Sequence, residues 1–328
     1  MKNLLTLSAC LLVAGAAHAQ SQVSTASNTA RHTAFVPLSS PANPNAVVNG
    51  AGPGTPLPAY GSYSQDSRIE QAGDFNYSTV NQHDGRGGLL GGSSAVIDQS
   101  GSHNTANQTQ DLTVLSNVAG GRNAMLTTQA GTYSQTDQTQ VGGDHNMAEI
   151  SQKLGSSLNR AIQTQGEGSD QSAYIDQTST SSGNRAEQSQ AGSLMTTVIT
   201  QKGANSYAKQ TQSGASNYGN DAGINQGLGS GNTAIQTQNG FYLNAAIDQS
   251  SSTVGGSVNS NYAKQSQTGY SNNATIGQHS SGNYAEQNQG DASHVYQNNT
   301  STITQSAVSS AAYTNQLGTQ NTAIVIQH

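Results

Sequence analysis

The feature that most constrains the fold of this chain is a seven-residue pattern that recurs through its central and C-terminal parts. One version, Asn-x-Ala-x-Gln-x-Gln, occupies residues 104–110, 159–165, 184–190, 232–238, 261–267 and 283–289. The other, x-x-Ala-x-Ile-x-Gln, occupies residues 93–99, 146–152, 171–177, 220–226, 243–249 and 272–278. The versions alternate, so one structural period holds two units and spans about 24 residues. A repeat of this length predicts a stacked, solenoid-like architecture.

Each unit alternates with a period of two, which is typical of a β-strand. The first, third, fifth and seventh residues then share one face, and they are Asn or Ser, Ala, Ile or Gln, and Gln. Charged residues fall on the other face, at the second, fourth or sixth place: Asp98, Glu149, Arg160, Asp176, Arg185, Glu187, Lys209, Asp248, Lys264 and Glu286. This segregation predicts a buried inner face and a solvated outer face.

These patterns predict an all-β chain in which residues 63–328 form a two-sided β-solenoid of about ten strand–turn–strand rungs. Stacked rungs would lie about 4.8 Å apart, with the two sheets about 10 Å apart. Because like strands stack on like strands, one sheet would carry an isoleucine ladder and the other a glutamine ladder. Stacked amides can satisfy each other along such a ladder. The residues predicted to form ladders and to direct self-assembly are Gln99, Asn104, Gln110, Asn184, Gln188, Gln190, Asn232, Gln236, Gln238, Gln267, Asn272, Gln278, Asn321 and Gln327.

The composition fits a polymer better than a globular enzyme or a nucleic-acid-binding protein. Only 32% of the residues are hydrophobic and 9% are charged, and the net charge is −6. A polar chain with so little charge repels itself weakly and is prone to β-aggregation. Its few Lys and Arg residues are scattered and offer no basic surface for nucleic acid. No segment after the N-terminal leader is apolar enough for a membrane helix.

The N-terminal region divides into a leader and an arm. Residues 1–19 resemble a secretion signal, with Lys2, an apolar stretch and an Ala17-His18-Ala19 cleavage site. A lipoprotein signal ending at Cys10 is the alternative. Residues 20–62 contain every proline of the chain, and we expect a flexible arm excluded from the sheets.

The repeat resembles that of the curlin family, Gln-x-Gly-x-x-Asn-x-Ala-x-x-x-Gln. The full motif occurs at residues 99–110, 267–278 and 316–327, and residues 201–212 carry Ser206 in place of Asn. Two features depart from the family: the number of repeats is about double, and many second strands place Gln where curlins have small or apolar residues.

The resemblance implies a subunit of curli, the amyloid fimbria of bacterial surfaces, which support biofilm matrix, cell aggregation and surface adhesion. It implies an extracellular location at the cell surface. It also implies export through an outer-membrane secretion pore with accessory proteins, and polymerisation with copies of the same chain after nucleation by a minor curlin. A second interpretation is that the chain is itself the minor curlin, acting as a nucleator or a cell-surface adhesin.

Catalytic and cofactor sites are not indicated. The eight histidines fall mostly in turns or termini and form no metal-ligand spacing, and the glycine-rich stretch 84–92 lacks a phosphate-loop ending. A β-solenoid polysaccharide lyase would need charges clustered along one groove, whereas these are spread. We therefore expect a protein that is not an enzyme and has no cofactor.

The strand at residues 321–327 is apolar on both faces over residues 323–326. We expect it to be the edge where the next subunit docks or where nucleation begins. The alternative is that it simply packs under the preceding rung.

Overall fold

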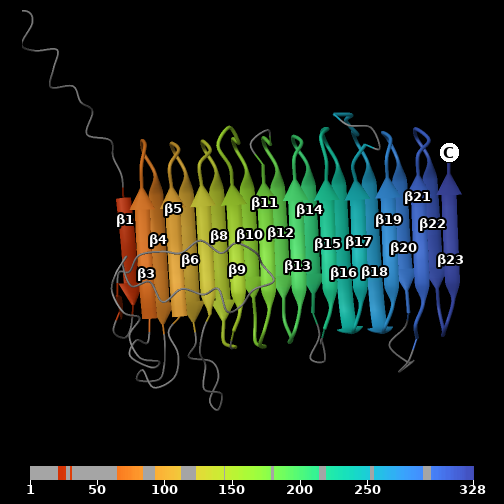
Figure 1. Cartoon of the computed structure of the whole chain (residues 1–328), viewed down its shortest axis with the longest axis horizontal. Helices are drawn as coiled ribbons and strands as arrows, with labels where there is room; N and C mark the ends of the chain where they lie inside the picture. The colour runs from red at the N-terminus through yellow and green to blue at the C-terminus, as the bar shows by residue number, and fades with distance from the viewer. Residues whose placement is uncertain are drawn as a thin grey trace, which may run out of the picture.

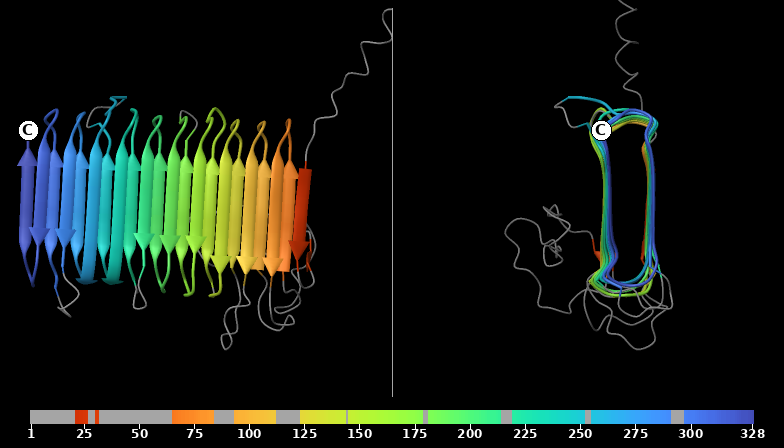
Figure 2. Two further views of the ribbon diagram at one scale, coloured as in Figure 1. Left: turned by 180° about the vertical axis from the view of Figure 1, so that it is seen from behind. Right: turned by 90° about the vertical axis from the view of Figure 1, so that its right-hand side faces the viewer.

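The computed structural model describes residues 21–26, 30–31, 65–83, 93–111, 123–143, 145–178, 181–213, 219–251, 255–290 and 297–328. Every helix or strand in these ranges is a β-strand, and the strands form two sheets that face each other (Figures 1 and 2). In both sheets all paired strands are parallel, and the chain passes from one sheet to the other after each strand from β3 onward. The predicted all-β, two-sided β-solenoid is confirmed.

The described part of the chain contains 11 strands in sheet A and 12 in sheet B, close to the ten rungs expected. Sheet A consists, in spatial order, of β1 (Ser21–Ala26), β4 (Tyr77–His83), β6 (Thr105–Asp111), β8 (Gln135–Val141), β10 (Arg160–Gln165), β12 (Arg185–Gln190), β14 (Tyr207–Gln212), β16 (Thr233–Phe241), β18 (Tyr262–Tyr270), β20 (Tyr284–Gln289) and β22 (Ala311–Gln316). Sheet B consists of β2 (Ala30–Arg31), β3 (Gln65–Gln71), β5 (Ser93–Gln99), β7 (Ala124–Gln129), β9 (Met147–Gln152), β11 (Ser172–Gln177), β13 (Thr196–Gln201), β15 (Asp221–Gln226), β17 (Asn244–Gln249), β19 (Asn273–Gln278), β21 (Thr300–Gln305) and β23 (Thr322–Gln327).

Neighbouring strands stack so that equivalent positions of the repeat lie opposite each other. Ile175 of β11 lies opposite Ile150 of β9 and Ile199 of β13. In sheet A, Gln188 of β12 is flanked by glutamines of β10 and β14 in the same way. The isoleucine ladder therefore lies in sheet B and the glutamine ladder in sheet A, as the sequence predicts. We call one strand of sheet B with the next strand of sheet A a rung.

The core is a thin layer between the two sheets, because each strand contributes only its inward side chains. Isoleucines of sheet B pack against alanines of sheet A, and both kinds are almost completely buried from β9 to β22. An alanine opposite each isoleucine brings the sheets close, and the end-on view in Figure 2 shows this narrow cross-section. Small inward residues thus set the distance that the glutamine side chains must span.

The arcs that connect the sheets impose their own sequence requirements. At Gly101 a Cβ atom would overlap the carbonyl oxygen of Gly131 in the next rung, so only glycine fits this close backbone approach. This explains the glycine of the repeat motif in that arc. This arc and others also hold a non-glycine residue in the left-handed region, including His103, Phe75, Tyr133 and Leu158.

Two short strands near the N-terminus depart from the expectation of an arm wholly outside the sheets. Strand β1 pairs in parallel with β4, and β2 pairs with β3, although both lie within residues 20–62. These strands precede the first proline, Pro37, so the proline argument does not apply to them. The six prolines and the leader, residues 1–19, lie outside the described residues.

Candidate self-assembly site

Three columns of glutamine side chains run along the solenoid, each bonded from rung to rung. One column occupies the seventh position of sheet B, from Gln71 to Gln327, and a second occupies the same position of sheet A, from Gln82 to Gln316. The third occupies the fifth position of sheet A, from Gln108 to Gln287. The Nε2 to Oε1 distances lie between 2.6 and 3.2 Å, which is good hydrogen-bond geometry.

Each bond in these columns has the same direction. The amide nitrogen of one rung donates to the amide oxygen of the following rung, as in Gln163 to Gln188 at 2.9 Å and Gln188 to Gln210 at 3.0 Å. In the described rungs, no ladder bond of the three columns runs backwards. The direction from N-terminal to C-terminal rungs is therefore built into the core.

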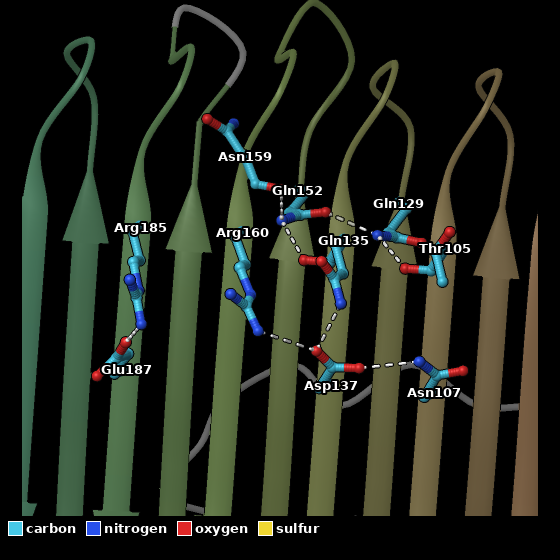
Figure 3. Close-up of polar contacts among 10 residues, drawn as sticks. All are labelled: Thr105, Asn107, Gln129, Gln135, Asp137, Gln152, Asn159, Arg160, Arg185 and Glu187. Atoms are coloured by element: carbon cyan, nitrogen blue, oxygen red, sulfur yellow. Dashed lines mark hydrogen bonds and ion pairs between the residues drawn. The ribbon is translucent and has the colours of Figure 1, made fainter.

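In most ladder amides the second N–H crosses the core to a backbone carbonyl of the opposite sheet, whereas that of Gln71 donates to the Ser78 hydroxyl. Gln188 Nε2 lies 2.9 Å from the backbone carbonyl oxygen of Tyr174 on β11. Gln152 of sheet B makes the corresponding bond from sheet B to sheet A, to the backbone carbonyl of Gln135. It also donates to the backbone carbonyl of Asn159 in the arc (Figure 3). A ladder glutamine thus uses both donors and its acceptor, which offsets the cost of burying a primary amide. It ties three strands together.

Asparagines at the first position perform a similar role in the arcs. Asn184 Oδ1 accepts the backbone N–H of Ser206 at 2.8 Å, and Asn184 Nδ2 donates to the Gly203 carbonyl at 2.8 Å. Both partners belong to the next rung. Asn104 makes the equivalent pair of bonds to Ser134 and Gly131. Side-chain hydrogen bonds, as well as backbone hydrogen bonds, therefore link each arc to the next.

The structure brings the predicted ladder residues into these columns. Twelve of them are buried: Gln99, Asn104, Gln110, Asn184, Gln188, Gln190, Asn232, Gln236, Gln238, Gln267, Asn272 and Gln278. Asn321 and Gln327 are only half-buried, because they belong to the last described strand of sheet B and its arc. The predicted set omits other members of the columns, such as Gln152 and Gln163, although the same spacing identifies them. The carbonyl partners across the core carry no signal in the sequence.

The last described strands, β22 and β23, each have a neighbour on one side only. On β23, Ala323 and Val325 face inward, whereas Ile324 and Ile326 face outward and are 65% and 56% exposed. These orientations match the sequence prediction. Gln316 and Gln327 at this edge occupy the same repeat position as the ladder glutamines of internal strands, whereas Thr314 replaces a glutamine at the fifth position of β22. An edge of this kind is a template for another parallel strand.

Charged residues of the outer face of sheet A pair between and within rungs. Asp137 accepts hydrogen bonds from Asn107 and Gln135, both at 2.9 Å, and lies 3.9 Å from Arg160 (Figure 3). Arg185 is paired with Glu187 on the same strand. Exposed pairs of this kind contribute little to stability, about 0–1 kcal/mol each. Arg160 and Arg185 lie opposite each other in the strand register, and these pairs give each of the two like charges an acidic partner.

One acidic group on the outer face of sheet B is less exposed than its position suggests. Asp176 occupies an outward position of β11, yet its side chain is buried and bonded to Lys153 Nζ at 2.7 Å. Burial, together with the Asp176 carboxylate, raises the pKa of Glu149 on β9 from its ordinary 4.5 to about 7, although Lys153 acts in the opposite direction. The alternation places these residues outward, but it does not predict their burial.

Metal-binding clusters are absent from the described ranges, where no three His, Cys, Asp or Glu side chains come together. Of the histidines, His103 lies in an arc and its ring stacks on Tyr133 at 4.5 Å. In the same ranges, no helix has the length and apolar character needed to span a membrane. The glycine-rich stretch 84–92 lies outside the described residues.

Neither a protein-family model nor a curated protein matches this chain.

Proposed function

We propose that this chain is a structural subunit of an extracellular, curli-like amyloid fibre, which it builds by end-to-end stacking of solenoids. The observation that supports this most strongly is the set of in-register glutamine ladders that reach the last described rung. The two seventh-position ladders reach this end at Gln316 and Gln327, whereas the fifth-position ladder stops at Gln287, opposite Thr314. A second copy placed there would extend both parallel sheets without a change of register. The curlin-type motif supports the same proposal.

The energetics of a ladder favour addition of matching rungs over termination. Every internal rung gives its amides a partner on each side, whereas an end rung leaves a row of strand edges and ladder amides facing solvent. Each hydrogen bond contributes only about 0.5–1.5 kcal/mol net, but a new rung forms many at once. Stacking also buries the inner side chains Ala323 and Val325 of the last described strand at the joint. Nearest-neighbour terms of this kind accumulate along a stack.

Polymerisation of the purified chain tests the proposal. We expect thioflavin-T fluorescence to rise after a lag, unbranched fibres in electron micrographs, and fibre diffraction near about 4.8 and 10 Å. The 4.8 Å reflection should lie along the fibre axis, because the strands run across the long axis of the molecule. A chain that stays monomeric for days at micromolar concentration would contradict the proposal.

The exposed isoleucines of β23 favour a second role, that of a minor subunit that nucleates fibres or attaches them to a surface. An apolar outward surface at one end suits the first encounter with another chain better than the polar outer faces of internal strands. The two roles differ in kinetics. A main subunit polymerises alone after a lag, whereas a nucleator at substoichiometric amounts removes the lag of another fibre-forming chain.

Secretion and partners belong to the same proposal. The leader at residues 1–19 would direct export, and an outer-membrane pore with accessory proteins would pass the unfolded chain to the surface. Cell fractionation with an antibody against the mature chain tests this location: fibres outside the cell are expected, and retention inside the cell would argue against it.

A further inference from the structure

The outer face of sheet A carries a stacked pair of tyrosines on adjacent rungs. Tyr262 of β18 lies directly opposite Tyr284 of β20 in the strand register. Their ring centroids are 5.0 Å apart and their planes differ by 7°. The same column holds Thr233 before the pair and Ala311 after it, so these two rings face no third tyrosine in the column.

The surroundings of the pair suit oxidation of a phenol. Tyr284 is 44% exposed and Tyr262 is half-buried, so an oxidant can reach both rings and the side chains have room to turn. The Tyr284 hydroxyl donates to Glu286 Oε2 at 3.0 Å. Lys264 also bonds Glu286 at 2.9 Å, and these contacts lower the pKa of that carboxyl. Glu286 is therefore a carboxylate that can take the phenolic proton when an electron leaves the ring.

We propose that Tyr262 and Tyr284 form a site of dityrosine cross-linking, in which one covalent bond staples adjacent rungs. The oxidant is hydrogen peroxide acting through a haem peroxidase. Each phenol loses one electron and one proton, and the two radicals join through their ortho carbons. The ortho hydrogens then leave as the rings regain aromaticity and the hydroxyls are restored. The net reaction joins two phenols with loss of two protons and two electrons, and one peroxide is reduced to two waters.

The fold selects this pair from the thirteen tyrosines of the chain. Tyr242 and Tyr270 are also close, with centroids 5.5 Å apart, but their planes are at 75° and present an edge to a face. Tyr313 lies opposite Glu286 rather than opposite Tyr284, so it is displaced along the strand. In the described strands, only Tyr262 and Tyr284 combine direct register with near-parallel rings.

Oxidation of the folded full chain with a peroxidase and limiting hydrogen peroxide tests the proposal. We expect dityrosine fluorescence, and a linked peptide pair two hydrogen atoms lighter than the sum of its parts, assigned by fragmentation to Tyr262 and Tyr284. The yield should not depend on protein concentration, because the bond is intramolecular. A linkage dominated by Tyr242 and Tyr270, or by pairs between chains, would overturn the proposal.

Conservative variants provide the controls. Tyr284→Phe and Tyr262→Phe keep the stacked rings but remove a coupling phenol, and each should abolish most of the dityrosine yield. Tyr207→Phe, in the same column but opposite Thr233, should leave the yield unchanged. In denaturant the preference for Tyr262 and Tyr284 should disappear. An undiminished yield in Tyr284→Phe, or the same linked pair in denaturant, would show that the fold does not direct the reaction.

Discussion

A buried glutamine in this solenoid depends on its neighbours more than a buried aliphatic side chain would. Gln236 accepts from Gln210, donates to Gln265, and donates across the core to the Gly223 carbonyl, each at 2.9 Å. An apolar residue of similar size would need none of these bonds, but it would also accept any register. The amide is satisfied only when the next rung is aligned, so it contributes specificity as well as stability.

Gln236→Lys should weaken the fold strongly, because it places an unpaired charge in the amide ladder at a cost of several kcal/mol. The matched control is Thr237→Lys, one residue away on the exposed face of β16. We expect urea unfolding at a clearly lower concentration, and slower fibre formation, for the first variant alone. Equal behaviour of the two variants would contradict the assignment of inner and outer faces.

Glu149 should make this part of the solenoid sensitive to pH. Its pKa is about 7 in the folded chain and 4.5 is its ordinary value, so the folded state binds the proton more tightly than the unfolded state. Its contribution is fully present below about pH 4.5 and is lost as the pH rises through 7. Asp176 and Lys153 act on this carboxyl electrostatically, and Glu149 in turn helps to raise the pKa of Tyr174, for which burial is the main cause.

Glu149→Gln replaces the protonated form and should remove this part of the pH dependence. The test compares the urea midpoints of the two proteins at pH 5 and pH 8. We expect the original chain to lose more stability than the variant on going to pH 8. If both lose the same amount, Glu149 does not titrate in that range.

Strand β23 is apolar on both faces over residues 323–326, and its two outward isoleucines are exposed. Ile324→Lys together with Ile326→Lys should lengthen the lag of fibre formation, because charge on an edge opposes the approach of another chain. Growth from added seeds should be less affected. Thr237→Lys, also outward but on the internal strand β16 and opposite the uncharged Thr211 and Ser266, is the control and should leave the lag unchanged. A double variant with an unchanged lag would place nucleation elsewhere.

At the scale of the whole molecule, rungs should be removable as units. Deleting residues 160–184 removes β10 and β11 and joins Asn159 to Arg185, which occupies the place of Arg160 in the repeat. The two sheets and all ladders then continue in register, and the loss of stability should be modest. Circular dichroism and urea unfolding measure the outcome.

Deleting only residues 160–171 is the informative comparison, because it removes β10 alone. Strand β11 would then enter sheet A, and Ile175 would stack on Gln138 in the glutamine column. Although it loses fewer residues, this variant should unfold at a lower urea concentration than the whole-rung deletion. The reverse order would contradict a fold organised by two-strand periods.

Much of this architecture follows from the repeat itself. A period of two identifies the inner face of each strand, and the alternation of Ile and Gln assigns strands to two sheets. The sequence does not indicate which carbonyl receives the second N–H of Gln188, because that depends on how the arcs offset the two sheets. Nor does it indicate the pairing of β1, whose residues carry no repeat motif. The Tyr262–Tyr284 stack can be predicted from the sequence, since both tyrosines occupy the second position of successive sheet A strands.

The shared direction of the glutamine bonds gives the molecule a polarity. Each amide nitrogen points toward the C-terminal end, so the two ends differ chemically even though the rungs between them look alike. An inverted copy would set nitrogen against nitrogen and run its strands antiparallel to the edge. Only a copy with the same heading continues the columns. A fibre of such copies therefore has two different tips, and its polarity follows the N-to-C direction of the polypeptide.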